Sequence, residues 1–167
     1  MKVLITGGSK GIGHEVAKLF ALNSHDVLVI SRNFKNEIEL NDKGIKTFSF
    51  DLLNKNYYNL INNIKKFGKI DILINNAGYL INKPFLNIND DELENIYKVN
   101  VYAPFKLIRE SFPYWSKKSH IINISSVGGV QGSMKFKGLS AYSSSKGAIC
   151  ILTECLAEEF KDTEVKF

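Results

Sequence analysis

A glycine-rich turn near the N-terminus limits the possible folds of this chain more than any other stretch. Residues 2–6 form a short apolar run that stops at glycines, which is typical of a buried parallel strand. In residues 12–22 the apolar side chains recur at helical spacing. Gly7, Gly11 and Gly13 lie between the two segments. The sequence therefore predicts a strand, a tight turn and a helix in direct succession.

The same alternation of strand and helix continues along the chain. Short apolar runs predict strands at residues 26–31, 45–50, 70–74 and 120–124, and residues 164–167 resemble the start of a sixth. Helices are predicted at 34–42, 57–67 and 141–160, and from the N-cap Asn89 past Asn100, where Pro104 either kinks or divides the helix. This pattern favours a parallel sheet with helices on both faces. We expect one α/β domain, residues 1–167, with a doubly wound, three-layer α/β/α architecture.

The charge of the chain gives little support to a nucleic-acid partner. Lysine and arginine outnumber the acidic residues by 22 to 17, for a net charge of +5. A nucleic-acid-binding protein concentrates such charge on one face or arm. Here the lysines are scattered singly or in pairs, so we expect no nucleic-acid binding.

Cysteine and histidine usage argues against a metal site. Cys150 and Cys155 lie in the last predicted helix without a CxxC spacing, and the three histidines are far apart in sequence. Two thiols in a reducing compartment is the simpler interpretation. The stretch before the glycines is too short for a signal peptide, and no run of 18 apolar residues occurs. We therefore expect a cytoplasmic protein that does not enter a membrane.

The glycine turn has the chemistry of a dinucleotide-binding site. Glycines let the backbone approach a pyrophosphate closely, and the following helix N-terminus offers free N–H groups and a partial positive charge. The spacing is GxxxGxG, and no Gly-Lys-Ser/Thr follows, which disfavours a P-loop. The candidate cofactor contacts of this turn are Gly7, Ser9, Lys10, Gly11, Ile12 and Gly13.

The end of the second predicted strand bears on the choice of cofactor. An NAD site places an acidic residue there to bind the ribose hydroxyls. This chain has Ser31 and Arg32 instead, so no carboxylate repels a 2′-phosphate and a guanidinium is available to pair with one. Lys10 adds a second cation. The sequence favours NADP(H) over NAD(H), although Arg32 could also point into water.

A phenol and an ammonium lie one helical turn apart in the last predicted helix. Tyr142 and Lys146 are separated by four residues, which places them on one face. Alone, such a pair usually marks a solvated helix face. It gains meaning from the other polar positions, which in order are the glycine turn, the Asn75–Gly78 turn, Asn100 and the pair Ser125-Ser126.

In this combination the chain resembles the short-chain dehydrogenase/reductase family, from about residue 2 to the last residue. The resemblance implies a Rossmann-type fold and hydride transfer between a nicotinamide cofactor and a carbonyl or alcohol. It implies that Tyr142 is the general acid or base, and that Lys146 lowers the pKa of the tyrosine and holds the nicotinamide ribose. Both residues are thus also candidate cofactor contacts. Ser126 is implied as a hydrogen-bond donor to the substrate oxygen, and Asn100 as the holder of a water linked to the lysine.

Further cofactor contacts follow from the same resemblance. Asp51 is implied to accept a hydrogen bond from the adenine amino group, and Leu52 to line the adenine pocket. From the turn after the fourth predicted strand, the implied contacts are Asn75, Ala77 and Gly78. Without the resemblance, Asp51 could be a helix cap or turn residue, and Asn100 an ordinary helix asparagine.

The chain departs from the family in two ways. Ser126 and Tyr142 are 16 residues apart, a few more than usual, and the extra length falls in residues 133–138. The sequence also ends where a sixth strand should begin, so we expect a sheet that lacks the last strands of the usual seven. Two hypotheses follow: an NADP(H)-dependent oxidoreductase, or a catalytically impaired nucleotide-binding or partner-binding remnant. A homo-oligomer, dimer or tetramer, is expected through the long helices at about 90–116 and 141–160.

Overall fold

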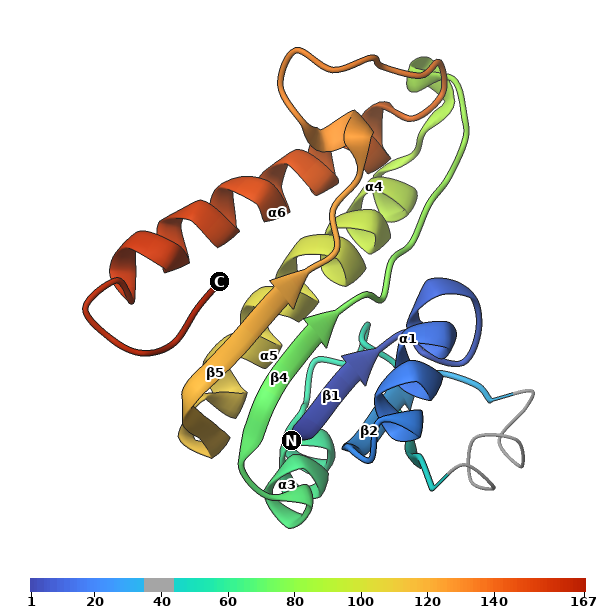
Figure 1. Cartoon of the computed structure of the whole chain (residues 1–167). Helices are drawn as coiled ribbons and strands as arrows, with labels where there is room; N and C mark the ends of the chain where they lie inside the picture. Colours follow the sequence, from blue (N-terminus) through green and yellow to red (C-terminus); the bar gives the residue numbers. More distant parts are fainter. Residues whose placement is uncertain (35–43) are drawn as a thin grey trace.

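The centre of the molecule is a five-stranded parallel sheet with strand order β3-β2-β1-β4-β5 (Figure 1). The computed structural model describes residues 1–34 and 44–167. The strands are β1 (Lys2–Thr6), β2 (Asp26–Ser31), β3 (Lys46–Ser49), β4 (Ile70–Asn75) and β5 (Trp115–Asn123). The strand order reverses at β1, as in a doubly wound sheet. The predicted α/β fold class is thus confirmed.

The register of the sheet brings the glycine turn, the end of β2 at Ser31 and the Asn75–Gly78 turn to one edge. Thr6, at the end of β1, pairs with Ile30 of β2 and with Asn75 of β4. All these strands run parallel, so their carboxyl ends meet at the same edge of the sheet. Ligands of such sheets bind there, beside the point where the strand order reverses.

Helices cover both faces of the sheet, in three layers (Figure 1). They are α1 (Gly11–Leu22), α3 (Tyr58–Phe67), α4 (Asp90–Tyr97), α5 (Ala103–Ser111) and α6 (Ser140–Glu159). The side chains of α1 pack on one face with Val3, Ile5 and Val29. On the other face, α3, α5 and the end of α6 pack against a larger cluster that includes Leu4 and Leu28.

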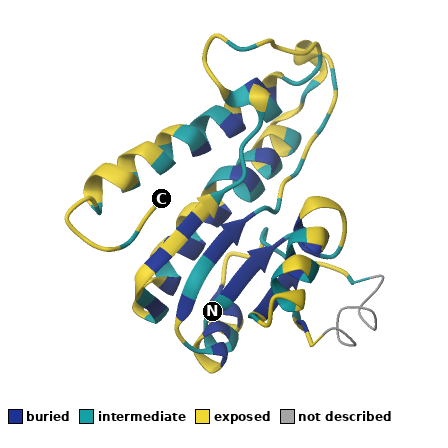
Figure 2. Cartoon of the chain, in the orientation of Figure 1, coloured by how far each residue is buried: buried dark blue, intermediate teal, exposed yellow. Residues whose placement is uncertain are grey.

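The buried core follows the two-residue period of the strands (Figure 2). Val3 and Leu4 are neighbours in sequence, and each is completely buried in a different cluster. Successive side chains of a strand point to opposite faces, so the middle of β1, residues 3–5, needs apolar side chains at successive positions. Full burial of each such side chain contributes roughly 1.5–3 kcal/mol to folding.

Two helix ends confirm the signals in the sequence. Asn89 caps α4: its side-chain oxygen accepts a hydrogen bond from the backbone N–H of Glu92, and Glu92 accepts one from the N–H of Asn89. This reciprocal pair satisfies two backbone donors of the first turn. Gly68 ends α3 with φ of 104°, a conformation that favours glycine.

The long helix predicted after Asn89 is divided. Residues Lys98–Tyr102 between α4 and α5 are π-helical, and Pro104 lies in the first turn of α5. Proline has no N–H and is tolerated only near a helix start, so the wider π turn lets the chain continue past it. A short 3₁₀ turn at Phe112–Tyr114 ends the segment.

The strands differ from the prediction mainly at the outer edges of the sheet. β5 begins at Trp115 rather than at residue 120, because a register shift between Ile70 and Ile72 lets Trp115 pair with Ile70. The polar residues 116–118 hide this extension in the sequence. The predicted sixth strand is represented by a single bridge between His120 and Lys166. The helix predicted at 34–42 lies almost wholly outside the described residues.

Candidate active site

The glycine turn leaves the N-terminus of α1 free to hold an anion. Within the described residues, no side chain caps this end, and its first turn carries no acidic residue. A Cβ on Gly7 would lie 2.7 Å from the Cα of Ala77, and one on Gly13 would lie 2.7 Å from the carbonyl oxygen of Gly7. Gly11 has φ of 62° and open space beside it. The turn thus has the close backbone approach and free N–H groups that a pyrophosphate requires.

The Asn76 side chain fastens this turn to the end of β4. Its amide nitrogen donates hydrogen bonds to the carbonyl oxygens of Thr6 at 3.1 Å and of Gly7 at 3.0 Å. The hydroxyl of Thr6 in return accepts from the N–H groups of Asn76 and Ala77. The two predicted turns therefore form one rigid unit.

A cavity of about 710 Å³ opens along the carboxyl ends of β1, β2 and β4. Ten of the predicted cofactor contacts line it: Gly7, Ser9, Lys10, Gly11, Ser31, Arg32, Asp51, Leu52, Ala77 and Gly78. Five other predicted cofactor contacts lie outside the lining: Ile12, Gly13, Asn75, Tyr142 and Lys146. Asn75 is buried and donates to the side-chain oxygen of Asn123 at 2.8 Å, which joins β4 to β5.

The lining also includes residues that sequence reasoning missed. Phe50 and Leu53 lie beside the predicted Asp51–Leu52 pair, and Asn76 lies inside the predicted turn. Asn95 and Val99 come from α4 and the π-helical segment, and no local pattern marks them. Ile30, Asn33 and Tyr79 complete the set.

The end of the cavity near β2 is polar and carries two cations. The Ser31 hydroxyl donates to the Ser9 hydroxyl at 2.9 Å, and Arg32 and Lys10 are exposed beside them. Among the described residues of the lining, Asp51 is the one acidic side chain. Its carboxylate accepts from the N–H of Leu53 at 3.0 Å, so Asp51 also forms the turn considered from sequence.

The π-helical segment buries the side chain of Asn100 against the turn after β4. Its oxygen accepts from the N–H of Tyr79 at 2.7 Å, and its nitrogen donates to the carbonyl of Tyr79 and the hydroxyl of Ser145, each at 2.9 Å. The Ser145 hydroxyl in turn donates to the carbonyl of Tyr142 at 2.7 Å. The cavity of about 710 Å³ that the predicted cofactor contacts line is called the cofactor cavity. Asn100 connects the cofactor cavity to the turn of α6 that carries Tyr142. Single π turns of this kind occur frequently at functional sites.

Lys146 places an almost fully buried ammonium beside Tyr142. Lys146 is 4% exposed, and its Nζ donates a hydrogen bond to the carbonyl of Ile124 at 2.7 Å. The same Nζ lies 5.8 Å from the centre of the Tyr142 ring. Burial lowers the pKa of Lys146, and the Cys150 thiol opposes this effect.

The loop after β5 is held directly on α6. A Cβ on Gly129 would lie 2.5 Å from the carbonyl carbon of Lys146, and the Ser125 hydroxyl donates to the Lys146 carbonyl at 2.8 Å. Ser126 begins the 3₁₀ turn Val127–Gly129 and accepts from the N–H of Gly128 at 3.4 Å. The structure thus brings Ser126 to the same part of α6 as Tyr142 and Lys146.

Gly78 connects these polar groups to the cofactor cavity. It lines the cavity, and a Cβ at this position would lie 3.7 Å from Lys146 Nζ and 3.8 Å from Asn100 Oδ1. A group that lay along Gly78 would therefore meet the buried ammonium. The residues present fit a dinucleotide that extends from the N-terminus of α1 toward Lys146.

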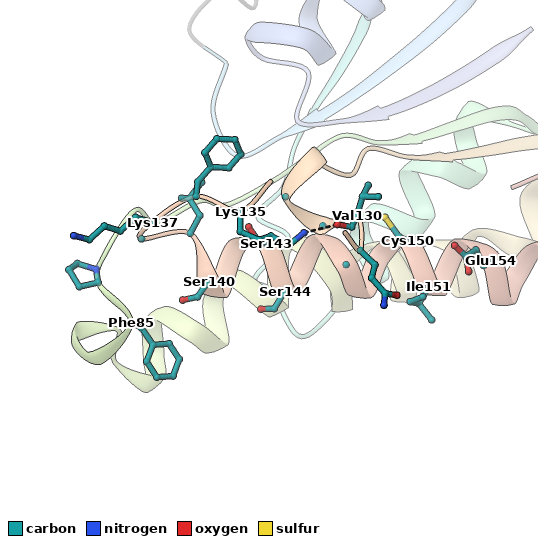
Figure 3. Close-up of a pocket in the computed structure, with 18 residues that line it drawn as sticks. Phe85, Val130, Lys135, Lys137, Ser140, Ser143, Ser144, Cys150, Ile151 and Glu154 are labelled. Atoms are coloured by element: carbon teal, nitrogen blue, oxygen red, sulfur yellow. Dashed lines mark hydrogen bonds between the residues drawn. The ribbon is translucent and has the colours of Figure 1, made fainter. Parts of the chain in front are cut away.

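A second cavity, of about 1060 Å³, extends along α6 from Phe85 to Glu154 (Figure 3). Its walls come from the loop after β4, the loop after β5 and α6 itself. Ser143 and Gly128 contribute to it, and these are close in sequence to Tyr142 and Ser126. The lining is mixed: Phe85, Phe136 and Ile151 are apolar, whereas Lys135 and Glu154 are charged.

Residues 1–34 and 44–167 contain neither a candidate metal cluster nor a helix suited to span a membrane. No cluster of three or more His, Cys, Asp or Glu residues suited to a metal ion occurs there. None of the helices in these ranges combines the length and the apolar character needed to cross a membrane.

Similarity to other proteins extends over almost the whole chain. The family model described as short chain dehydrogenase matches residues 1–167. The L-2,3-butanediol dehydrogenase of Corynebacterium glutamicum is 33% identical, across 93% of this chain and 64% of that protein. The carbonyl reductase (NADPH) 2 of Sus scrofa is 26% identical, across 99% of this chain and 68% of that protein. This chain therefore spans about two thirds of the length of these relatives.

Solved structures of dehydrogenases are also similar to this chain over almost its whole length. A 4-hydroxyisoleucine dehydrogenase complexed with NADH has a TM-score of 0.90 and 35% identity, over 98% of this chain and 69% of that one. BdcA in complex with NADPH has a TM-score of 0.87 and 28% identity, over 98% of this chain and 66% of that one. The similar proteins therefore include both NADH and NADPH complexes. With a family match over its whole length, this chain belongs to the short-chain dehydrogenase/reductase family.

Proposed function

We propose that this protein transfers a hydride between NADP(H) and a carbonyl or alcohol substrate. The observation that carries the proposal is the buried Lys146 ammonium, 5.8 Å from the Tyr142 ring and next to Gly78 of the cofactor cavity. Burying an unpaired ammonium is costly. A site that keeps this charge beside a phenol is suited to proton transfer.

The protein's part in the reaction is to move a proton and to orient the substrate oxygen. The bound nicotinamide supplies or accepts the hydride. In reduction, the Tyr142 hydroxyl donates its proton to the substrate oxygen, and in oxidation the phenolate takes that proton back. Lys146 supplies a positive charge beside the reacting phenol, and Ser126 donates a hydrogen bond to the substrate oxygen.

The remaining candidate residues hold these groups in place. Asn100 fixes the Tyr79 backbone and, through Ser145, the Tyr142 carbonyl. Asp51 and Leu52, which line the cofactor cavity, would receive the adenine, and the N-terminus of α1 would receive the pyrophosphate. Lys146 would also contact the nicotinamide ribose, since it lies beside Gly78.

The preference for NADP(H) rests on charge. Arg32 and Lys10 lie at the β2 end of the cavity, where the described lining places Ser31 rather than an acidic residue. A guanidinium pairs with a 2′-phosphate through charge-assisted hydrogen bonds. The measurement is a titration of the purified 167-residue protein with NADPH and with NADH, followed by nicotinamide fluorescence and by melting temperature.

We expect NADPH to bind at least about tenfold more tightly, the equivalent of one charge-assisted hydrogen bond. Arg32→Ser should remove most of the preference by weakening NADPH alone. Arg109→Ser, an exposed arginine on α5, is the matched control and should change neither affinity. Equal binding of NADH and NADPH by the wild type would contradict the charge argument.

Turnover tests the proton-transfer step. With NADPH and a generic dicarbonyl, Tyr142→Phe should lower kcat by at least about a hundredfold, the ordinary contribution of a positioned proton donor. NADPH affinity should remain unchanged, and Tyr58→Phe, an exposed tyrosine on α3, should behave like the wild type. Full turnover by Tyr142→Phe would exclude this mechanism. If the folded wild-type protein binds cofactor without turnover, the alternative of a catalytically impaired nucleotide-binding protein holds instead.

A further inference from the structure

Two loops that are far apart in the sequence meet at one end of the second cavity. The backbone N–H of Lys83, in the loop after β4, donates to the carbonyl of Gly138 at 2.9 Å. Gly138 has φ of 82°, and a Cβ at this position would collide with the Asn82 side chain. The positive φ favours glycine here, and a Cβ would also lie 3.3 Å from the Lys83 backbone nitrogen, a tight contact.

The side chain of Lys83 extends this contact to α4. Its ammonium donates to both carboxylate oxygens of Glu92 at 2.9 Å. Glu92 is itself fixed, because it accepts from the N–H of Asn89 at 3.0 Å in the capping pair of α4. The Lys83 bond and the Asn89 N–H lower the pKa of Glu92, so the carboxylate is charged at neutral pH.

Partial burial strengthens the ion pair. The side chains of Lys83 and Glu92 are 34% and 27% exposed, and those of the neighbouring Lys98–Glu94 pair are 31% and 57% exposed, so the two pairs differ in the burial of the carboxylate. An exposed pair is largely screened by water and contributes little. The Lys83–Glu92 pair also joins separate parts of the chain, whereas Lys98 and Glu94 lie one turn apart on one helix.

We propose that Lys83 and Glu92 are positioning residues that hold the long loop after β5 in place as a wall of the substrate pocket. Lys83, Glu92 and Gly138 together are called the loop clamp. The loop in question, residues 133–138, contains the extra length between Ser126 and Tyr142. It lines the second cavity through Lys135, Phe136 and Lys137, and Phe85 lines the same cavity from the loop after β4.

The clamp should act on one cavity and leave the other unchanged. Gly138 lines the second cavity, and none of the three clamp residues is among the described lining of the cofactor cavity. Loosening the clamp would therefore free residues 133–138 without altering the nucleotide site. That the second cavity receives substrate rests on the proposed oxidoreductase function, but the clamp can be tested without turnover.

Limited proteolysis of the folded protein provides the test. Lys135 and Lys137 are exposed trypsin sites inside the clamped loop, and cleavage requires local release of the backbone. We expect Glu92→Gln and Lys83→Met to speed cleavage after these two lysines by about twofold to fivefold, the range of one ion pair in a local equilibrium. Lys83→Arg should keep the slow wild-type rate. The matched control is Glu94→Gln, which removes the neighbouring ion pair and should have no effect.

Two further measurements separate positioning from general stabilisation. NADPH affinity should be the same in all variants, and in an active protein KM for the carbonyl substrate should rise while kcat stays within about twofold. Unchanged cleavage in both Glu92→Gln and Lys83→Met would overturn the proposal. So would faster cleavage at all sites together, in proportion to a lower melting temperature, since that would show a merely stabilising pair. Because the cleavage assay needs no cofactor, its result is independent of whether the proposed function holds.

Discussion

Asn100 and Lys146 are polar side chains that the fold buries almost completely, with 1% and 4% exposure. Asn100 is satisfied by the Tyr79 backbone and by Ser145, so its burial costs little. The Lys146 ammonium donates a hydrogen bond to one carbonyl of the described protein, that of Ile124, and its charge remains buried. The two side chains therefore have different roles. Asn100 stabilises the fold, whereas Lys146 keeps a charge where the proposed chemistry needs it.

The cost of burying Lys146 predicts a dependence of stability on pH. Its folded pKa lies below the ordinary value of 10.5, so between the two values the unfolded chain binds more protons. The unfolding free energy of the wild type, relative to Lys146→Met, should therefore rise with pH in this window, by at most about 1.4 kcal/mol per pH unit. Below the window the difference should be constant.

Urea unfolding between neutral pH and about pH 10 measures this difference. Lys65→Met, at an exposed lysine of α3, is the control and should show no pH dependence relative to the wild type. If Lys146→Met gave the same flat profile, the ammonium would not be desolvated in the folded protein.

The loop after β5 and helix α6 form their contact through glycines. A Cβ on Gly129 would lie 2.5 Å from the Lys146 carbonyl carbon, and a Cβ on Gly147 would lie 3.2 Å from the Gly129 carbonyl oxygen. Neighbouring backbone atoms cannot move as a flexible side chain can. The position of Ser126 relative to Tyr142 thus depends on the absence of side chains at this crossing.

Gly129→Ala should therefore destabilise the protein by steric overlap, by about 1–3 kcal/mol. Gly132→Ala is the comparison, because Gly132 has φ of 76° but open space around it. Gly132→Ala should lower the free energy of unfolding by about 1–2 kcal/mol, through backbone strain alone. Chemical unfolding gives both values, and only Gly129→Ala should also reduce turnover, because only it moves Ser126 away from α6. Equal turnover in the two variants would contradict this explanation.

In the whole molecule, apolar side chains remain exposed on the helices that cover β4 and β5. Tyr102, Phe105 and Ile151 are 59%, 48% and 59% exposed. The helices that carry them are joined near α4, where the Tyr97 hydroxyl donates to the Ser144 hydroxyl at 3.1 Å. An apolar surface of this kind is suited to association between copies of a chain.

We expect the protein to form a homo-oligomer through these helices. Light scattering coupled to size-exclusion chromatography should give a dimer or tetramer mass for the wild type. Ile151→Glu and Tyr102→Glu should lower that mass, because an interface buries its apolar centre and excludes unpaired charge. Leu22→Glu, at an exposed leucine of α1, should leave it unchanged. A monomeric wild-type protein would rule out this surface as an interface.

Local signals in the sequence determined most of the fold. The two-residue and helical periods marked the strands and helices, and Gly68 and the N-cap Asn89 marked helix ends. These signals are readable because each depends on residues within one or two turns of one another. The glycine turn was readable for the same reason. Where the polar residues 116–118 interrupted the period, the start of β5 was predicted too late.

The tertiary structure alone decided which of these residues meet. Asn75 and Asn76 are adjacent, yet one joins β4 to β5 and the other supports the phosphate turn. The contact of Lys83 with Gly138 joins segments more than fifty residues apart in the printed sequence. Such pairings depend on strand order, register and backbone packing, which a linear pattern does not contain. The sequence by itself thus determined the elements and the candidate chemistry, whereas the packing of the sheet and its helices determined the geometry of the site.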